Sequence, residues 1–167
     1  MSPVTETSTA LLDRPKLSDL AVEHLCDFRV DLEPYQLIGT PIGARMVFVA
    51  RGGRVEGERL NGEILPGSAD WLQVGDDSIG RVDVRAMVRT DDEAMIYYTA
   101  RGVIKLPSDG LQRLDAGERL PFEETYVRTT PRFETSDERY TWLNELVIVG
   151  HNQLSKNHID YRMYRVL

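Results

Sequence analysis

PGSADWLQVGDDSIGRVDVRAM, residues 66–87, ends in the segment that decides the fold. From residue 82 onward, apolar and polar side chains alternate. This is the pattern of a β-strand, whose successive side chains point to opposite faces of a sheet. The apolar positions share one face, and Asp83 and Arg85 share the other face with Met87. A charged pair on one face of a strand is exposed to water, forms a buried ion pair or lines a polar pocket. The function inferred from the sequence depends on which of these holds.

Much of the remaining chain has the same β character. Strands are expected over residues 24–32, 36–39, 43–50, 54–60, 61–65, 80–89, 94–103, 125–129, 146–150 and 159–167. Residues 51–54 and 75–78 are expected to form turns, and residues 131–138 to be irregular. The polar segment 105–121 predicts a loop or short helix that could act as a flap. Short strands, glycine-rich turns and little helix predict an all-β barrel or sandwich of roughly eight to ten strands.

The composition is that of a globular protein. The chain has 167 residues, of which 41% are hydrophobic and 28% charged, and it is long enough to bury a core. Residues 1–20 are rich in Ser, Thr, Pro and charged residues, which predicts a flexible N-terminal arm. Residues 21–167 predict a single domain. The formal net charge of −7 disfavours nucleic acid and anionic membranes as partners, because both require a basic surface.

Cysteine usage and hydropathy narrow the class of protein further. The single cysteine, Cys26, excludes an intrachain disulfide, and no Cys/His spacing indicates a metal site. The first 20 residues lack the basic start and apolar run of a secretory signal. No apolar stretch approaches the roughly 18 residues that span a bilayer. We therefore expect a cytoplasmic protein without a metal or cofactor.

Several longer motifs together resemble a known family. They are GTPIGAR (39–45), GGRVEGERLNGEILPGSADW (52–71), VDVR (82–85), TDDEAMIYY (90–98) and YVRTTPRFETSDERYTWLNELVIVG (126–150). They resemble the domain of unknown function 3237 family, also called uncharacterised protein family 0311, over roughly residues 21–167. The chain departs from the family in one hairpin turn, where it has Asp92-Glu93 and the family tends to have Asp-Gly.

The resemblance implies a single-domain, antiparallel β-barrel of the calycin (lipocalin-like) type over residues 21–167, often in a homodimer or higher homo-oligomer. Such a barrel commonly encloses a cavity for one small ligand. The family has no general assigned reaction. Related cofactor-free barrels of natural-product pathways often act as cyclases, isomerases or lyases, which is an analogy at the level of the fold.

Asp83 and Arg85 are the first candidate site residues. In a pocket wall, Arg85 would orient a substrate carbonyl or carboxylate, and Asp83 would act as a base or acceptor. A guanidinium lowers the pKa of a neighbouring carboxyl, so tight pairing would make Asp70 or Glu134 the better base. The alternative is a salt bridge, inside the barrel or across two exposed strands.

A second group of candidates lies near the loop before Asp70. Asp70 could abstract a proton and Trp71 could stack on a planar ligand; alternatively, the tryptophan plugs one end of the barrel. Arg45 is the lone charge in an apolar strand, where it could pair with Asp70 or Asp83. Tyr98 is either a phenolic acid in the pocket or an ordinary core aromatic.

A third group comes from the last third of the chain. Arg128, Glu134, Tyr140, Trp142 and Asn144 would suit the mouth of a pocket. They would equally suit a packed, hydrogen-bonded corner that closes the barrel.

Together these residues predict a cofactor-independent acid/base enzyme, which would be an isomerase, cyclase or lyase. Its substrate would be a small, partly apolar metabolite bound inside the barrel, and the analogy above suggests secondary metabolism. The alternative is a non-catalytic protein that binds or carries a small molecule. A third reading is a structural subunit whose charged strand face is an interface.

Overall fold

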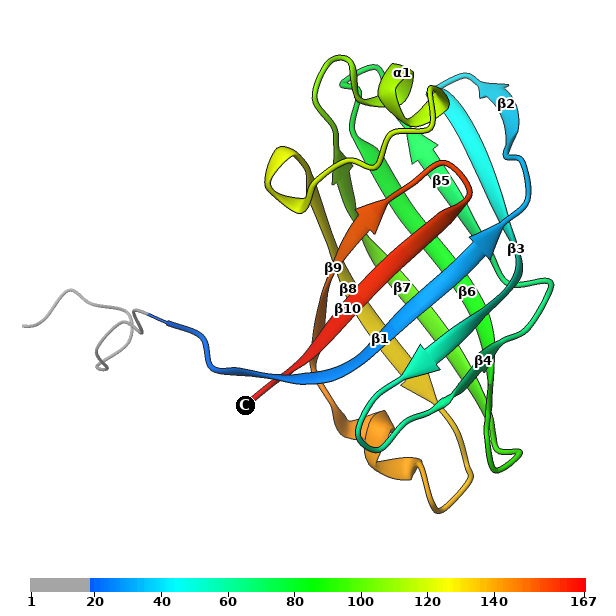
Figure 1. Cartoon of the computed structure of the whole chain (residues 1–167), viewed down its shortest axis with the longest axis vertical. Coiled ribbons are helices and arrows are strands. Elements are labelled where there is room, and N and C mark those ends of the chain that lie inside the picture. Colours follow the sequence, from blue (N-terminus) through cyan, green and yellow to red (C-terminus); the bar gives the residue numbers. More distant parts are fainter. Residues whose placement is uncertain (1–18) are drawn as a thin grey trace, which may run out of the picture.

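The computed structural model describes residues 19–167, which form ten strands and three short helical segments (Figure 1). The strands are β1 (Val22–Leu32), β2 (Gln36–Thr40), β3 (Gly43–Glu56), β4 (Gly62–Ile64), β5 (Ala69–Val74), β6 (Gly80–Thr90), β7 (Met95–Lys105), β8 (Tyr126–Glu134), β9 (Ile148–Leu154) and β10 (His158–Val166). The helical segments are α1 (Gly110–Asp115), η1 (Phe122–Glu124) and η2 (Thr141–Glu145). The arm expected over residues 1–20 lies almost entirely outside the described residues.

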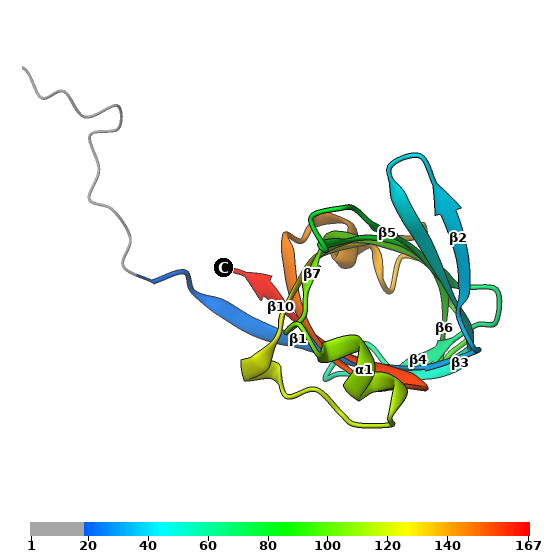
Figure 2. The same cartoon turned by 90° about the horizontal axis from the view of Figure 1, so that it is seen from above.

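The strands form one antiparallel sheet that closes into a barrel, as the view along the axis shows (Figure 2). The sheet runs from β1 through β10, β9, β8, β7 and β6 to β4 and β3, and β3 pairs back with β1. One edge of β3 pairs with β2 along its first half and with β1 along its second half. The other edge pairs with β5 along the first half and with β4 along the second half. Ten strands therefore fill eight positions of an all-β barrel with little helix.

The alternation in β6 sets the inner and outer faces. Val82, Val84 and Ala86 are buried in the barrel, whereas Arg85 and Met87 are exposed outside it. The same alternation in the other strands fills the interior with apolar side chains, and burial of this surface is the main favourable term in folding.

Two expected boundaries differ from the structure. Residues 51–54 do not form a turn, because β3 continues through Gly52 and Gly53 to Glu56. Strand β8 continues past Pro131 to Glu134, although residues 131–138 were expected to be irregular. Proline is tolerated there because β8 pairs with β9 only at Arg128 and Thr129, which leaves one edge of β8 free of a hydrogen-bond ladder further along.

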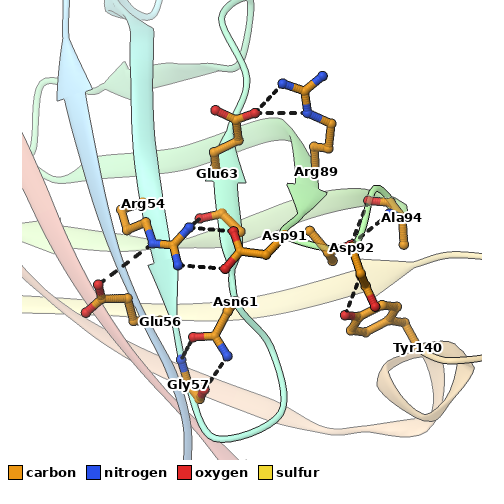
Figure 3. Close-up of polar contacts among 12 residues, drawn as sticks. Arg54, Glu56, Gly57, Asn61, Glu63, Arg89, Asp91, Asp92, Ala94 and Tyr140 are labelled. Carbon is orange, nitrogen blue, oxygen red and sulfur yellow. Dashed lines mark hydrogen bonds and ion pairs between the residues drawn. The ribbon is translucent and has the colours of Figure 1, made fainter.

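The turn between β6 and β7 explains how the chain tolerates Asp92-Glu93. The backbone N–H of Glu93 donates to the carbonyl of Thr90, and Glu93 has a φ of 70°. This is a three-residue hairpin loop in which a left-handed residue follows a turn, and glycine is favoured at that position. The Thr90 hydroxyl, which bonds Ala94 N–H and the Asp92 carboxylate, and the Tyr140 hydroxyl, which donates to Asp92, hold the loop in place (Figure 3).

The two ends of the barrel are covered differently. The α1 segment lies at the end where β2 is found, and the orange η2 segment lies at the opposite end (Figure 1). At the α1 end, the core is covered by Leu106 and Leu114, and at the η2 end it is covered by Trp142 and Leu146. The segment 105–121 thus contains the expected short helix. Within residues 19–167, no helix has the length and apolar composition needed to cross a membrane.

Close backbone approach at Gly102 gives a test of the barrel geometry. A Cβ atom there would lie 2.1 Å from the carbonyl oxygen of Arg128 on the neighbouring strand, whereas a Cβ at Gly39 would meet no atom within 4 Å. We expect Gly102→Ala to lower the free energy of unfolding by at least about 2 kcal/mol and Gly39→Ala to change it by less than about 0.5 kcal/mol. Urea denaturation measures both, and equal effects would contradict the close approach.

Candidate functional site

The carboxyl group of Asp70 lies inside the barrel. Strand β5 turns this side chain inward, where the residue is only 8% exposed. The Asp70 carboxylate accepts a hydrogen bond of 3.0 Å from the backbone N–H of Asp83 on β6. Burial raises the pKa of Asp70 to about 6, and the negative charge of Asp83 adds to this, against the lowering effect of the hydrogen bond. Asp70 can therefore both hold and release a proton near neutral pH.

Two buried phenols accompany this carboxyl. Burial raises the pKa of Tyr161, and the negative charge of Asp70 raises it further. Burial also raises the pKa of Tyr98, with smaller contributions from Tyr161, Cys26 and Asp70. Both phenols therefore remain protonated and able to donate hydrogen bonds. The Tyr98 hydroxyl has no hydrogen-bond partner among the described residues, which makes it a donor for a bound molecule.

Aromatic rings fix the position of Tyr98. Its ring centroid lies 5.2 Å from that of Phe28 and 5.2 Å from that of Phe133, and Phe28 also packs edge-on against Tyr161. Such tilted and edge-to-face pairs are favourable beyond their buried area. The phenols are therefore held by a packed aromatic cluster contributed by four strands.

A small cavity adjoins these groups. Its volume is about 30 Å³, which accommodates about two water molecules. The lining is mostly apolar, and its polar members are Ser68, Asp70, Tyr98 and Tyr161. No Lys, Arg or His side chain of residues 19–167 lines it, so this interior does not offer a charged partner to an anion.

Two further buried polar atoms face the interior on the other side of the barrel. Thr129 Oγ1 on β8 and Asn152 Oδ1 on β9 have no hydrogen-bond partner within residues 19–167. Asn152 lies directly across from Tyr161 in the register of β9 and β10. An unsatisfied buried polar atom costs about 1–3 kcal/mol, and neither residue lines the small cavity.

A larger hollow of about 680 Å³ lies on the outer face of β1, β9 and β10, beside residues 119–123. Its arginines already have acidic partners: Arg29 and Arg119 bond Asp160, and Arg162 bonds Asp27. These contacts are satisfied and largely open to solvent, so they mark a surface ion-pair network. This hollow also reaches Asn152 and Tyr161. Tyr98, with its unpartnered hydroxyl, and the buried Asp70 line the interior cavity and not this hollow, and we therefore take the cavity as the candidate site despite its smaller volume.

The structure corrects the expected position of Asp83 and Arg85. Both side chains point away from the barrel interior, with Arg85 exposed. The carboxylate of Asp83 pairs with Arg101 at 3.0 Å rather than with Arg85. They do not line an interior pocket, because the apolar residues of β6 occupy the inner face. Asp83 acts on the interior through its backbone N–H, which bonds Asp70, and through its negative charge, which raises the pKa of Asp70.

Arg45 and Trp71 also lie on the outer face. Arg45 donates a hydrogen bond of 2.7 Å to the backbone carbonyl of Trp71, and the Trp71 side chain is 45% exposed. Arg45 therefore does not pair with Asp70 or Asp83, and Trp71 does not plug the barrel.

Glu134 and Arg128 are likewise outside the cavity. Glu134 is exposed and lies 3.6 Å from Arg132 of its own strand. The Arg128 guanidinium stacks over the rings of Phe122 and Tyr126. Neither side chain lines the cavity that contains Asp70, so Glu134 is not placed as a base there and Arg128 does not form its mouth.

Tyr140, Trp142 and Asn144 form the packed corner at the end opposite α1. Asn144 bonds both backbone groups of Thr135, at 2.9 and 2.8 Å, and the Arg59 guanidinium lies 4.0 Å above Trp142. Figure 3 shows Tyr140 directed at Asp92 in the neighbouring hairpin. The alternative of a closing corner therefore describes these residues, and the pocket mouth does not.

Of the expected site residues, only Asp70 and Tyr98 line the interior cavity. Sequence reasoning missed Tyr161 and Asn152. The alternation in β10 places Tyr161 with Met163 on one face, but both faces of that strand carry tyrosines, so alternation alone does not identify the inner one. Within residues 19–167, no three His, Cys, Asp or Glu side chains are placed to hold a metal ion.

An antiparallel barrel with a buried carboxyl and two phenols inside it defines the general class of this protein. The chain belongs to the family described as Protein of unknown function (DUF3237), which it matches over residues 20–166. A UPF0311 protein of Rhodopseudomonas palustris (strain TIE-1) is 32% identical over 130 residues, covering 78% of this chain and 84% of that relative. The resemblance inferred from the motifs is thus confirmed.

Solved structures confirm the barrel. A conserved protein of unknown function from Rhodopseudomonas palustris has a TM-score of 0.84 at 26% identity, covering 90% of this chain and 100% of that one. A β-barrel-like protein from Acinetobacter baumannii AYE gives 0.75 at 31% identity, covering 92% and 100%. An enzyme from Penicillium herquei gives 0.68 at 16% identity, covering 92% and 99%, a likeness of fold alone.

The raised pKa of Asp70 predicts a specific pH dependence of stability. The folded state keeps the proton up to about pH 6, whereas the unfolded state loses it near the ordinary value of 3.8. Between these pH values the folded state binds more protons, so stability falls as the pH rises, and the loss is complete above about pH 6. Asp70→Asn removes this titration and keeps an acceptor for the Asp83 N–H. Relative to wild type, it should gain up to about 3 kcal/mol between pH 4 and pH 7.

Urea denaturation at several pH values measures this gain. Asp76→Asn, at an exposed position in the β5–β6 turn, is the matched control and should follow the wild type. A constant difference between Asp70→Asn and wild type from pH 4 to pH 7 would contradict the raised pKa.

Proposed function

We propose that the protein is a cofactor-independent acid/base enzyme that acts on a small uncharged molecule inside the barrel. The observation that carries this proposal is the buried Asp70 carboxyl, with its pKa raised to about 6, beside the unpartnered Tyr98 hydroxyl. The distant Penicillium herquei neighbour is an enzyme, which supports catalysis as an analogy of fold.

The roles of the groups follow from their protonation states. The Asp70 carboxylate would take a proton from a carbon or hydroxyl of the substrate and return it at another position. The Tyr98 and Tyr161 hydroxyls would donate hydrogen bonds to a substrate oxygen and stabilise the negative charge that develops there. Transfer of a proton without an external oxidant or reductant corresponds to isomerisation, cyclisation or elimination.

The lining restricts the substrate. An anion would leave its charge uncompensated in an interior without a cationic side chain, so the substrate is neutral when it binds. The cavity itself admits only a few non-hydrogen atoms. A larger molecule must displace a side chain of the lining, and Phe48 is a candidate. Its ring centroid lies 5.4 Å from that of the exposed Tyr35.

A binding or carrier protein is the second candidate, since the apolar lining would serve it equally well. It requires no proton transfer, and therefore no carboxyl with a raised pKa. The two functions differ in whether a bound probe exchanges protons.

Exchange of the α-protons of neutral ketones tests the enzymatic proposal. Acetone, cyclopentanone and 2-tetralone in D₂O span a range of sizes, and NMR follows the incorporation of deuterium. Wild type should accelerate exchange of at least one of them, with a rate that rises through about pH 6 and then levels off, because the carboxylate form is the base. Asp70→Asn should lower this rate by about 10²–10⁴-fold, and Asp76→Asn should leave it unchanged.

Wild-type exchange that survives in Asp70→Asn would overturn the role of Asp70. Saturable binding of the neutral dye N-phenyl-1-naphthylamine without exchange of any ketone would favour the carrier.

Tyr98→Phe provides a second test, because it should raise the stability of the protein and lower the rate of proton exchange. Removing an unsatisfied buried hydroxyl should raise the free energy of unfolding of the free protein by about 1 kcal/mol. The same change should slow exchange at least about tenfold, because a donor to the substrate is lost. A structural role alone would instead lower stability and leave exchange unchanged.

A further inference from the structure

Strands β5, β6 and β7 present an apolar patch on their outer face, on the opposite side of the sheet from Asp70. Trp71, Met87, Met95 and Tyr97 form this outer patch, with exposed fractions of 45%, 41%, 50% and 41%. Met87 and Tyr97 are direct cross-strand neighbours. Large apolar side chains gathered on one face of a soluble protein mark an interaction site.

An arginine without a partner lies within the outer patch. Arg85 is exposed between the small neighbours Ala69 and Thr99, and it is the one arginine of residues 19–167 that no described residue bonds, pairs with or stacks on. Arginine, tryptophan and tyrosine contribute most of the binding energy at protein interfaces, where methionine is also enriched. The patch therefore has the composition of an interface and an exposed guanidinium that has no acidic partner among the described residues.

The opposite outer face differs in character. On β1 and β10, the ion pairs Arg29–Asp160 and Asp27–Arg162 satisfy the charges across the strands. The outer face of β6 and β7 also carries one such pair, Asp83–Arg101, but it differs in its four large exposed apolar side chains.

We propose that the outer patch is the contact surface of a homodimer. Its occupant is a second copy of this chain, because the patch holds an arginine and has a glutamate at its edge that can pair across such an interface. Glu134 lies beside Tyr97 at the edge of the patch, is exposed, and has only a long contact of 3.6 Å to Arg132. The partner's Glu134 is therefore available to Arg85.

The strand register shows that a single two-fold axis can bring Arg85 opposite the partner's Glu134. Arg85, Thr99 and Arg132 lie in one row across β6, β7 and β8, and Met87, Tyr97 and Glu134 lie in the next outward-facing row. Arg85 and Glu134 of one chain are about 12 Å apart at ordinary strand spacings, too far to pair with each other.

The midpoint between Arg85 and Glu134 falls at Tyr98 of β7. A two-fold axis in the plane of the interface, perpendicular to the line between these residues at that midpoint, brings each Arg85 opposite the partner's Glu134. The same axis passes close to Met87, Tyr97, Thr99 and Arg132. These residues therefore face their own counterparts, and each Arg132 keeps Glu134 of its own strand 3.6 Å away. The Arg85–Glu134 contact then occurs twice, as an isologous interface requires.

This proposal is independent of the proposed function, and its test measures mass. Sedimentation equilibrium of the wild type should give twice the chain mass of 19.0 kDa. Met87→Glu should raise the dimer dissociation constant at least about 100-fold, while Leu111→Glu, at an exposed apolar position on α1, should leave it unchanged. Circular dichroism establishes that each variant is folded. A monomeric wild type, or a dimer unaffected by Met87→Glu, would overturn the proposal.

A charge exchange tests the predicted pair directly. Arg85→Glu should weaken the dimer by placing two carboxylates together, and Glu134→Arg should weaken it by placing two guanidiniums together. The double variant should recover most of the wild-type affinity. Additive losses in the double variant would exclude this pairing and its axis.

The exposed hairpin of β2 and β3 is the competing contact, because Leu37 and Ile38 are exposed on opposite faces of β2. Ile38→Glu should leave the dimer intact. Loss of the dimer in Ile38→Glu, together with a dimer that persists in Met87→Glu, would assign the interface to the hairpin instead.

Discussion

Strand β3 has to pair with four other strands, and the closed barrel depends on this requirement. Its first half pairs with β2 and β5, and its second half pairs with β1 and β4. The change occurs near Gly52 and Gly53, where a Cβ at Gly53 would lie 2.3 Å from the carbonyl oxygen of Arg29. Because a glycine permits this approach, the sheet can bend and close. Closure then gives every strand one inner and one outer face.

Strands β5, β6 and β7 combine both surfaces to which we assign a function. Their inner faces carry Asp70 and Tyr98, and their outer faces carry Trp71 and Arg85. The hydrogen bond from the Asp83 backbone to the Asp70 carboxylate joins β6 to β5 at the centre of the interior site. A rigid partner on the outer face would therefore restrain the strands that position the acid/base groups.

Alternation in the sequence is sufficient to predict the strands and the residues that share a face, as in β6. It does not determine which face is inside, because that depends on what all the other strands contribute to the centre. The alternation in β6 therefore suggests a pocket lined by Asp83 and Arg85. In the structure, apolar side chains from the strands around the barrel fill the interior, and these two residues lie outside. The corner of Tyr140 and Asn144 depends on a loop folding back onto the β6–β7 turn, a long-range contact without a local signal.

The first and last strands of the described chain are neighbours in the barrel. Residues 22–31 of β1 pair with residues 158–166 of β10, so one edge of β1 stays unpaired until residues 158–166 have left the ribosome. The barrel cannot close during synthesis, and the exposed edge of the growing chain must be kept from pairing with other nascent chains. Because Val22 lies beside Val166, linking the start of β1 to the end of β10 and opening a loop elsewhere would preserve every strand pairing while changing the order in which the pairs can form.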